Sequence, residues 1–214
     1  MNQAKDARAD SKSGVLFVPA SSFLAAENPD RRTLANAAKN SYLCRRIDFL
    51  VEKNDVASLR ERIRLYDRAY KFSKMAYLLV DKSSCLFNLR RLDPSIPFRD
   101  VFLPLLHPDL RGNIDIVSHR DRFKLLYVYV MTVLESDPLL ISSASKILKD
   151  LAQFPSSNDI RALKKHPGYA QQLSHEDKDL LDQIERDWDS KITAARAYLE
   201  RAVAAQSRPA RDEG

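Results

Sequence analysis

The fold of this chain is organised by one segment, DRFKLLYVYVMTVLES, which spans residues 121–136. Its apolar residues fall on every side of a helix instead of forming one stripe. A helix that is apolar all round is covered on all sides by other elements. We therefore expect a central helix here, with the rest of the chain packed around it. Ser118-His119-Arg120-Asp121 has the form of a capping box, which predicts that the helix starts at this point.

The composition favours helices throughout. Only four glycines occur among the 214 residues, while Ala, Leu and the charged residues are abundant. Neither G-x-G-x-x-G nor G-x-x-x-x-G-K-[ST] is present, which argues against a dinucleotide-binding or P-loop protein. The sequence predicts an all-α fold, a compact bundle of about seven or eight helices with disordered N- and C-terminal tails.

Periodicity, capping residues and prolines place the individual helices. We expect helical segments over residues 30–53, 56–82, 83–92, 98–106, 121–136, 138–154 and 155–166. From Ser174 a long amphipathic helix is expected to run to Gln206, with apolar residues every three or four positions.

This pattern divides the chain into four parts. They are a flexible N-terminal arm (1–27), a helical core domain (28–172), the long amphipathic C-terminal helix (173–206) and a disordered tail (207–214).

The cysteines and the absence of a leader bear on the compartment. Cys44 and Cys85 lie in apolar helical settings, which predicts free thiols in a reducing environment. The N-terminus lacks the apolar core of a secretory signal, and no apolar stretch reaches the ~20 residues of a membrane span. We expect an intracellular, cytoplasmic protein, and leave open secretion through a non-classical signal.

The sequence offers no catalytic or metal-binding motif. The four histidines are scattered, and no Cys/His cluster has the spacing of zinc ligands. No candidate nucleophile carries the glycines of a strained elbow or oxyanion hole. We predict a protein without enzymatic activity, metal or cofactor.

Charge is distributed unevenly along the chain. The stretch from Arg31 to Arg91 holds fifteen Lys and Arg against six Asp and Glu, whereas the stretch from Leu173 to the end holds seven against ten. Such asymmetry bears on partners and association rates and not on fold. It predicts an acidic partner.

Two groups of residues are the candidate binding sites. The basic group consists of Arg45, Arg46, Arg60, Arg64, Arg68 and Lys71. Its last four members recur at helical spacing, which places them on one helix face. The apolar group is Trp188 with Ile184 and Ile192 on the C-terminal helix, and we predict it as the anchor because Trp and Arg dominate interface energies.

Two functions fit these features. The first is a helical adaptor or scaffold that docks an acidic protein partner through the basic surface and apolar helix faces. The alternative is an RNA- or single-strand-binding protein, nucleocapsid-like, in which Tyr66, Tyr70 and Tyr77 stack on bases between the cations. Tyrosines at this spacing are also typical of a core. The C-terminal helix is expected either to screen the basic residues or to project toward a partner.

Overall fold

The computed structural model describes residues 31–111, 115–135 and 143–206. Over these residues the chain forms nine α-helices, two short 3-10 helices and no strand, which confirms the predicted all-α fold. The predicted arm (1–27), the tail (207–214) and the first residues of the predicted helix 138–154 lie outside the described residues.

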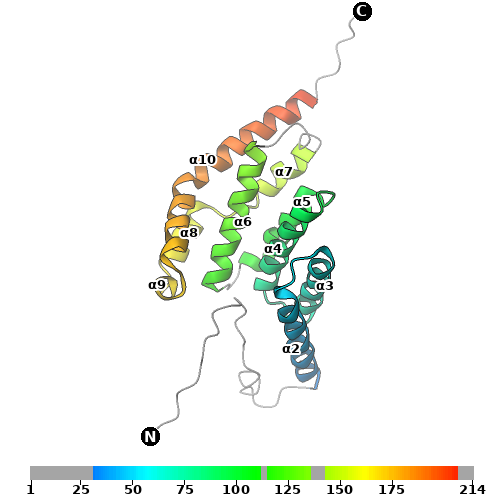
Figure 1. Cartoon of the computed structure of the whole chain (residues 1–214). Coiled ribbons are helices and arrows are strands. Elements are labelled where there is room, and N and C mark those ends of the chain that lie inside the picture. Colours follow the sequence, from blue (N-terminus) through cyan, green and yellow to red (C-terminus); the bar gives the residue numbers. More distant parts are fainter. Residues whose placement is uncertain (1–30, 112–114, 136–142, 207–214) are drawn as a thin grey trace, which may run out of the picture.

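The elements follow one another as α2 (Arg31–Val51), α3 (Val56–Ser73), α4 (Tyr77–Leu92), α5 (Phe98–Phe102), the 3-10 helices η1 (Leu103–Leu106) and η2 (Pro108–Arg111), α6 (Ile116–Glu135), α7 (Ala144–Leu151), α8 (Ser157–Lys164), α9 (Tyr169–Gln172) and α10 (His175–Gln206). Figure 1 shows α6 in the middle, α4 on one side of it and α10 on the other, with α2 and α3 at one end beyond α4. The long C-terminal helix is confirmed as α10.

Two apolar clusters hold these helices together. The larger one surrounds α6 and includes Phe123, Tyr129 and Trp188. The smaller one joins α2, α3 and α4 through side chains such as Leu43 and Leu59. Helix α4 contributes to both clusters, so it connects the two halves of the molecule. Within the smaller cluster Cys85 is buried, and both cysteines are free thiols as predicted.

The predicted helix 56–82 is wrong, because the chain breaks after Ser73. Lys74 adopts a left-handed conformation with φ 55° and ψ 22°, and its N–H donates to the Tyr70 carbonyl. The next helix then starts at Tyr77 and runs through Ser83, where a new segment was expected. The buried Ser83 hydroxyl donates to the Val101 carbonyl at 2.7 Å, so this serine fixes α4 against α5 instead of starting a helix.

The start of the central helix is also corrected. Helix α6 begins at Ile116 and not at Asp121. The carboxylate of Asp115 accepts hydrogen bonds from the Ser118 backbone N–H at 2.9 Å and from its hydroxyl at 2.6 Å. An aspartate in this position satisfies the free N–H groups of a first helical turn, so the predicted capping box lies inside the helix.

An ion pair between the partly exposed Arg99 and the buried Asp150 joins α5, α6 and α7. Asp150 is 1% exposed and accepts two hydrogen bonds from Arg99, at 2.7 Å from Nε and 2.8 Å from Nη2. The Tyr129 hydroxyl donates to the same carboxylate at 3.2 Å. The buried carboxylate of Asp150 therefore connects α7 to α5 and α6.

We predict that Arg99→Ala lowers the free energy of unfolding by roughly 3–5 kcal/mol, because it leaves the Asp150 carboxylate buried without a counter-charge. Urea denaturation followed by circular dichroism measures the loss. Arg161→Ala is the matched control, since its ion pair with Glu185 is exposed and exposed pairs contribute about 0–1 kcal/mol. Equal losses in the two variants would contradict the assignment.

The carboxyl group of Asp81, which lies on α4 near α6, has a raised pKa. Burial, together with the nearby charges of Asp121 and Asp115, raises the pKa of Asp81 on α4 to about 7, and the Arg62 guanidinium of α3 opposes this shift. The folded state therefore keeps a proton on Asp81 that the unfolded chain, with an aspartate pKa near ~3.9, has already lost. The stability that this extra proton contributes is fully present below the unfolded-state pKa of ~3.9. It is lost as the pH rises from there through the folded-state pKa of about 7.

Asp81→Asn is accordingly expected to remove this decline. The variant is predicted to be more stable than the wild type by roughly 1–3 kcal/mol at about pH 8, and equal to it near ~pH 4. Urea midpoints measured across this range test the difference, with the exposed Asp100→Asn as control. Parallel pH profiles for wild type and Asp81→Asn would show that Asp81 ionises normally.

Candidate interface on α2 and α3

All six predicted basic residues are exposed. Arg45 and Arg46 come from α2, and the other four come from α3, which packs directly against it. At 3.6 residues per turn, Arg60, Arg64, Arg68 and Lys71 fall within an arc of about 80° on α3. The structure thus brings together the residues that the spacing predicted.

Ion pairs neutralise part of this group. Glu61 lies between the two helices and contacts Arg46 at 3.2 Å and Arg64 at 3.8 Å. Arg60 contacts Asp93 in the turn after α4 at 2.8 Å. Within the described part of the chain no ion pair is shown for Arg45, Arg68 or Lys71, so the surface keeps a positive surplus.

Two exposed aromatic rings that are not among the predicted binding residues extend this surface along α2. Tyr42 is 60% exposed and Phe49 is 73% exposed. With Arg45 and Arg46 they occupy positions i, i+3, i+4 and i+7, which share one helix face. The opposite face of α2 is buried through Leu43 and Ile47.

We call the six basic residues together with Tyr42 and Phe49 the α2–α3 face. Lysines lie over exposed rings at its margin. The Lys53 Nζ is 4.9 Å from the centre of the Phe49 ring, and the Lys39 Nζ is 5.3 Å from that of Phe72 on α3. Each of these two exposed rings therefore has a lysine ammonium over its face.

The three tyrosines proposed to stack on bases are packed against the protein. Tyr66 is 4% exposed within the smaller cluster, and its hydroxyl accepts a hydrogen bond from Arg62. Tyr70 is bound through its hydroxyl to His107 and Asp109. Tyr77 packs against the same cluster. Tyr66 is therefore a core residue, whereas Tyr70 and Tyr77 are partly buried, and the Lys74 Nζ lies 5.1 Å from the centre of the Tyr70 ring.

The predicted apolar anchor is corrected by the structure. Trp188 is 0% exposed, as is Ile184, and Ile192 is partly buried against the same core. The Trp188 indole donates to the Pro155 carbonyl at 2.9 Å, and its ring packs between Phe123 and Phe154. Trp188 and Ile184 are core residues that offer no surface to a partner.

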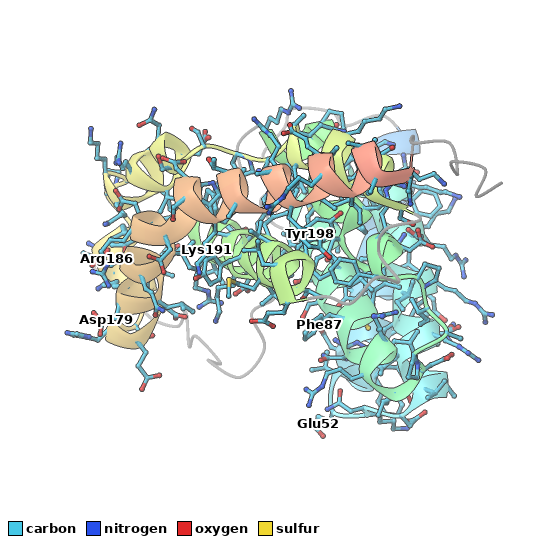
Figure 2. All side chains as sticks on the ribbon, turned by 90° about the horizontal axis from the view of Figure 1, so that it is seen from above. Glu52, Phe87, Asp179, Arg186, Lys191 and Tyr198 are labelled. Carbon is cyan, nitrogen blue, oxygen red and sulfur yellow. The ribbon has the colours of Figure 1, made fainter. Side chains whose placement is uncertain are left out.

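The acidic residues of α10 pair with helices other than α3. Asp177 contacts Arg120 at 2.7 Å and Lys124 at 3.6 Å, both on α6. Glu185 contacts Lys164 of α8 at 2.6 Å. In Figure 2, Asp179 near the start of α10 lies at the left edge of the molecule, and Glu52 just after α2 lies at its lower edge. These carboxylates therefore neutralise α6 and α8 and leave the α2–α3 face unscreened.

Two other features are absent from the described residues. No helix among them is both long and apolar enough to cross a membrane. They also contain no group of three or more His, Cys, Asp or Glu residues arranged to hold a metal ion. No protein-family model matches the chain, and no curated protein or solved structure matches it either.

We predict that Trp188→Ala destabilises the fold by roughly 3–5 kcal/mol, because it removes a fully buried ring and leaves a cavity. Thermal or urea unfolding measures this loss. Arg196→Ala is the control, because Arg196 is an exposed residue on the same helix. If the Trp188→Ala protein were as stable as the Arg196→Ala protein, the assignment of Trp188 to the core would be contradicted.

Proposed function

We propose that the protein is a non-enzymatic helical adaptor that docks an acidic protein partner through the α2–α3 face. The observation that carries the proposal is the stripe Tyr42, Arg45, Arg46 and Phe49 on the outer side of α2. Single exposed apolar residues are ordinary on protein surfaces. Two large rings flanking two arginines on one helix face combine the residue types that dominate binding energy at interfaces.

The chemistry of this stripe suits an amphipathic helix rich in Asp and Glu. Apolar residues of such a helix would cover Tyr42 and Phe49, as in other complexes where a helix docks by anchors at i, i+3, i+4 and i+7. Its carboxylates would meet Arg45, Arg68 and Lys71, for which no internal ion pair is shown among the described residues. Complementary charge speeds encounter and fixes the orientation of the partner.

The alternative is single-stranded RNA on the same cations. It loses the stacking role of the buried Tyr66, and Tyr70 and Tyr77 offer only partly exposed rings to a base. Salt separates the two functions. A complex that neutralises six or more phosphates loses roughly a thousandfold or more in affinity between ~50 and ~200 mM salt, whereas an interface with an apolar centre loses much less.

The test uses a designed acidic amphipathic peptide and a labelled ~20-nucleotide RNA, both followed by fluorescence anisotropy at the same two salt concentrations. We expect the peptide to bind more tightly than RNA at the higher salt. Tyr42→Ala/Phe49→Ala and Arg45→Ala/Arg46→Ala are each expected to weaken the peptide complex by about tenfold or more.

Arg196→Ala/Arg201→Ala is the matched control, because it removes two exposed arginines from α10 and leaves the α2–α3 face intact. This control is expected to bind the peptide like the wild type. Tight RNA binding with a steep salt slope, lost in Arg60→Ala/Arg64→Ala/Arg68→Ala, would replace the adaptor with the alternative. Equal weakening in the control and the α2 variants would contradict both.

A further inference from the structure

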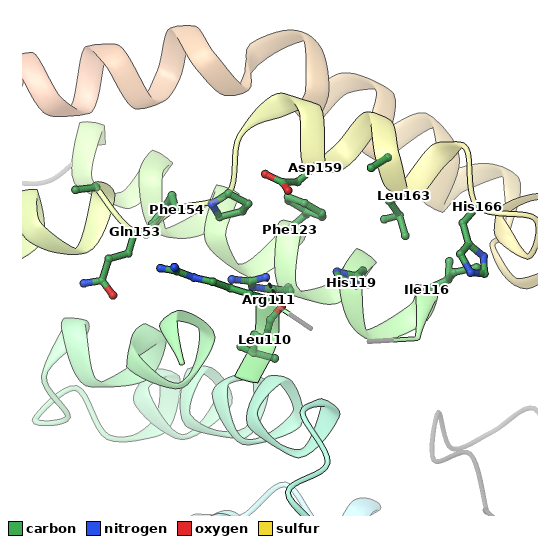
Figure 3. A pocket seen from close by; sticks show the side chains of 14 residues that line it. Leu110, Arg111, Ile116, His119, Phe123, Gln153, Phe154, Asp159, Leu163 and His166 are labelled. Atoms are coloured by element: carbon green, nitrogen blue, oxygen red, sulfur yellow. Dashed lines mark hydrogen bonds between the residues drawn. The ribbon is translucent and has the colours of Figure 1, made fainter. Parts of the chain in front are cut away.

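A cavity of about 610 Å³ opens between η2, the start of α6 and the segment from the end of α7 to α8. Figure 3 shows side chains from these elements around it. None of its lining residues belongs to α2 or α3, so it is separate from the α2–α3 face. Its volume falls within the range of about 300–1,000 Å³ that is usual for small-molecule sites.

The cavity wall contains a buried arginine without an acidic partner. Arg122 is 6% exposed. Its Nε donates to the Leu105 carbonyl at 3.2 Å and its Nη1 donates to the Leu110 carbonyl at 2.9 Å. These bonds fix the direction of the guanidinium, yet among the described residues no carboxylate forms an ion pair with it.

A buried charge of this kind is costly unless an opposite charge compensates it. Burial lowers the pKa of Arg122 to about 10, which still leaves the group protonated at neutral pH. The wall therefore carries a fixed positive charge whose two backbone acceptors supply only partial negative charge.

The other polar groups of the cavity are mostly donors. Arg111 adds a second guanidinium. The His166 Nδ1 accepts the Gly168 N–H at 3.1 Å, which places the proton of the neutral ring on Nε2. Burial and the charge of Arg122 lower the pKa of His119, so a bound anion would favour its protonation.

Asp159, the single carboxylate among the described lining residues, is already engaged. It accepts the Ser156 backbone N–H at 2.7 Å and the Ser156 hydroxyl at 2.9 Å, and the first of these bonds belongs to the capping box of α8. Its charge favours the protonated form of Arg122 without contacting it as an ion pair. The lining therefore carries two arginines and one carboxylate that is already hydrogen-bonded. This leaves an excess of positive charge that an anionic ligand would neutralise.

Aromatic rings supply the rest of the wall. Phe123 and Phe154 line the cavity, and both are held in place by Trp188, with ring centres 5.7 Å and 6.3 Å from it. A ligand that fills the site therefore needs an apolar body as well as an anionic group.

We propose that this cavity binds a small organic oxyanion, with its phosphate or carboxylate on Arg122 and Arg111 and its apolar body against Phe123 and Phe154. The guanidinium fork matches either oxyanion. This site is independent of the docking function, and each stands if the other fails.

The test titrates the full chain with phenyl phosphate, benzoate, inorganic phosphate and the uncharged benzyl alcohol, using calorimetry and the emission of Trp188. This is the sole tryptophan of the chain, and it contacts both ring walls. We expect phenyl phosphate or benzoate to bind at least about tenfold more tightly than benzyl alcohol and inorganic phosphate, and to shift the emission. The stronger of the two identifies the oxyanion.

Arg111 is exposed, so Arg111→Ala is expected to leave the stability of the fold unchanged. This variant is expected to weaken binding of the organic anion by about tenfold. Arg186→Ala is its matched control, since Arg186 lies on the exposed side of α10 (Figure 2) and outside the cavity. Arg122→Gln is expected to weaken binding by about a hundredfold or more, and Arg122→Lys, which keeps the charge, to weaken it less.

If Arg122→Gln does not fold, Arg111→Ala and Arg122→Lys still decide the outcome. The proposal is overturned if neither organic anion binds at millimolar concentration, or if Arg111→Ala and Arg186→Ala bind it equally. Equal affinity for benzyl alcohol and phenyl phosphate would also overturn it, because the arginines would then have no role.

Discussion

The structure depends on covering α6, a helix with apolar side chains on all of its sides. Helices α4 and α5 pack against one side of it, and α10 packs against another. The pair of Arg99 and Asp150, with the Tyr129 hydroxyl, fixes α5, α6 and α7 at the centre of this arrangement. The apolar stripe of α10 is buried in the cluster around α6. Trp188 therefore serves the core, and the helix has little apolar surface left for a partner.

The same arrangement decides where charge is compensated. The acidic first half of α10 lies beside α6 and α8, where Asp177 and Glu185 each contact two basic side chains. Helices α2 and α3 lie beyond α4 and receive no ion pair from these two carboxylates. Their positive surplus and the exposed rings of Tyr42 and Phe49 remain on the surface, and this is the physical basis of the proposed docking function.

Much of the architecture follows from the sequence, because it depends on local signals. The scarcity of glycine and the regular apolar spacing predict an all-α fold, and the start of α10 after Ser174 agrees with its capping residues. The break at Lys74 has no such signal, since a non-glycine residue in the left-handed conformation is uncommon. The burial of Trp188 cannot be predicted from the sequence either, because periodicity shows which residues share a helix face but not which neighbouring helix covers that face.

Tyr42 and Phe49 share the face of Arg45 and Arg46, and this spacing was available in the sequence. The cavity was not, because Arg111, Arg122 and His166 meet only in the folded chain.

The central claim is that partners meet the outer side of α2 and not α10. Photo-crosslinking tests it most directly, with a photoreactive amino acid placed at Tyr42 in one protein and at the exposed Gln183 of α10 in another, each expressed in the cells that make this chain. The account predicts a discrete adduct with an acidic protein from position 42, lost in Arg45→Ala/Arg46→Ala, and none from position 183. Adducts formed from position 183 alone, or RNA adducts from position 42, would contradict it.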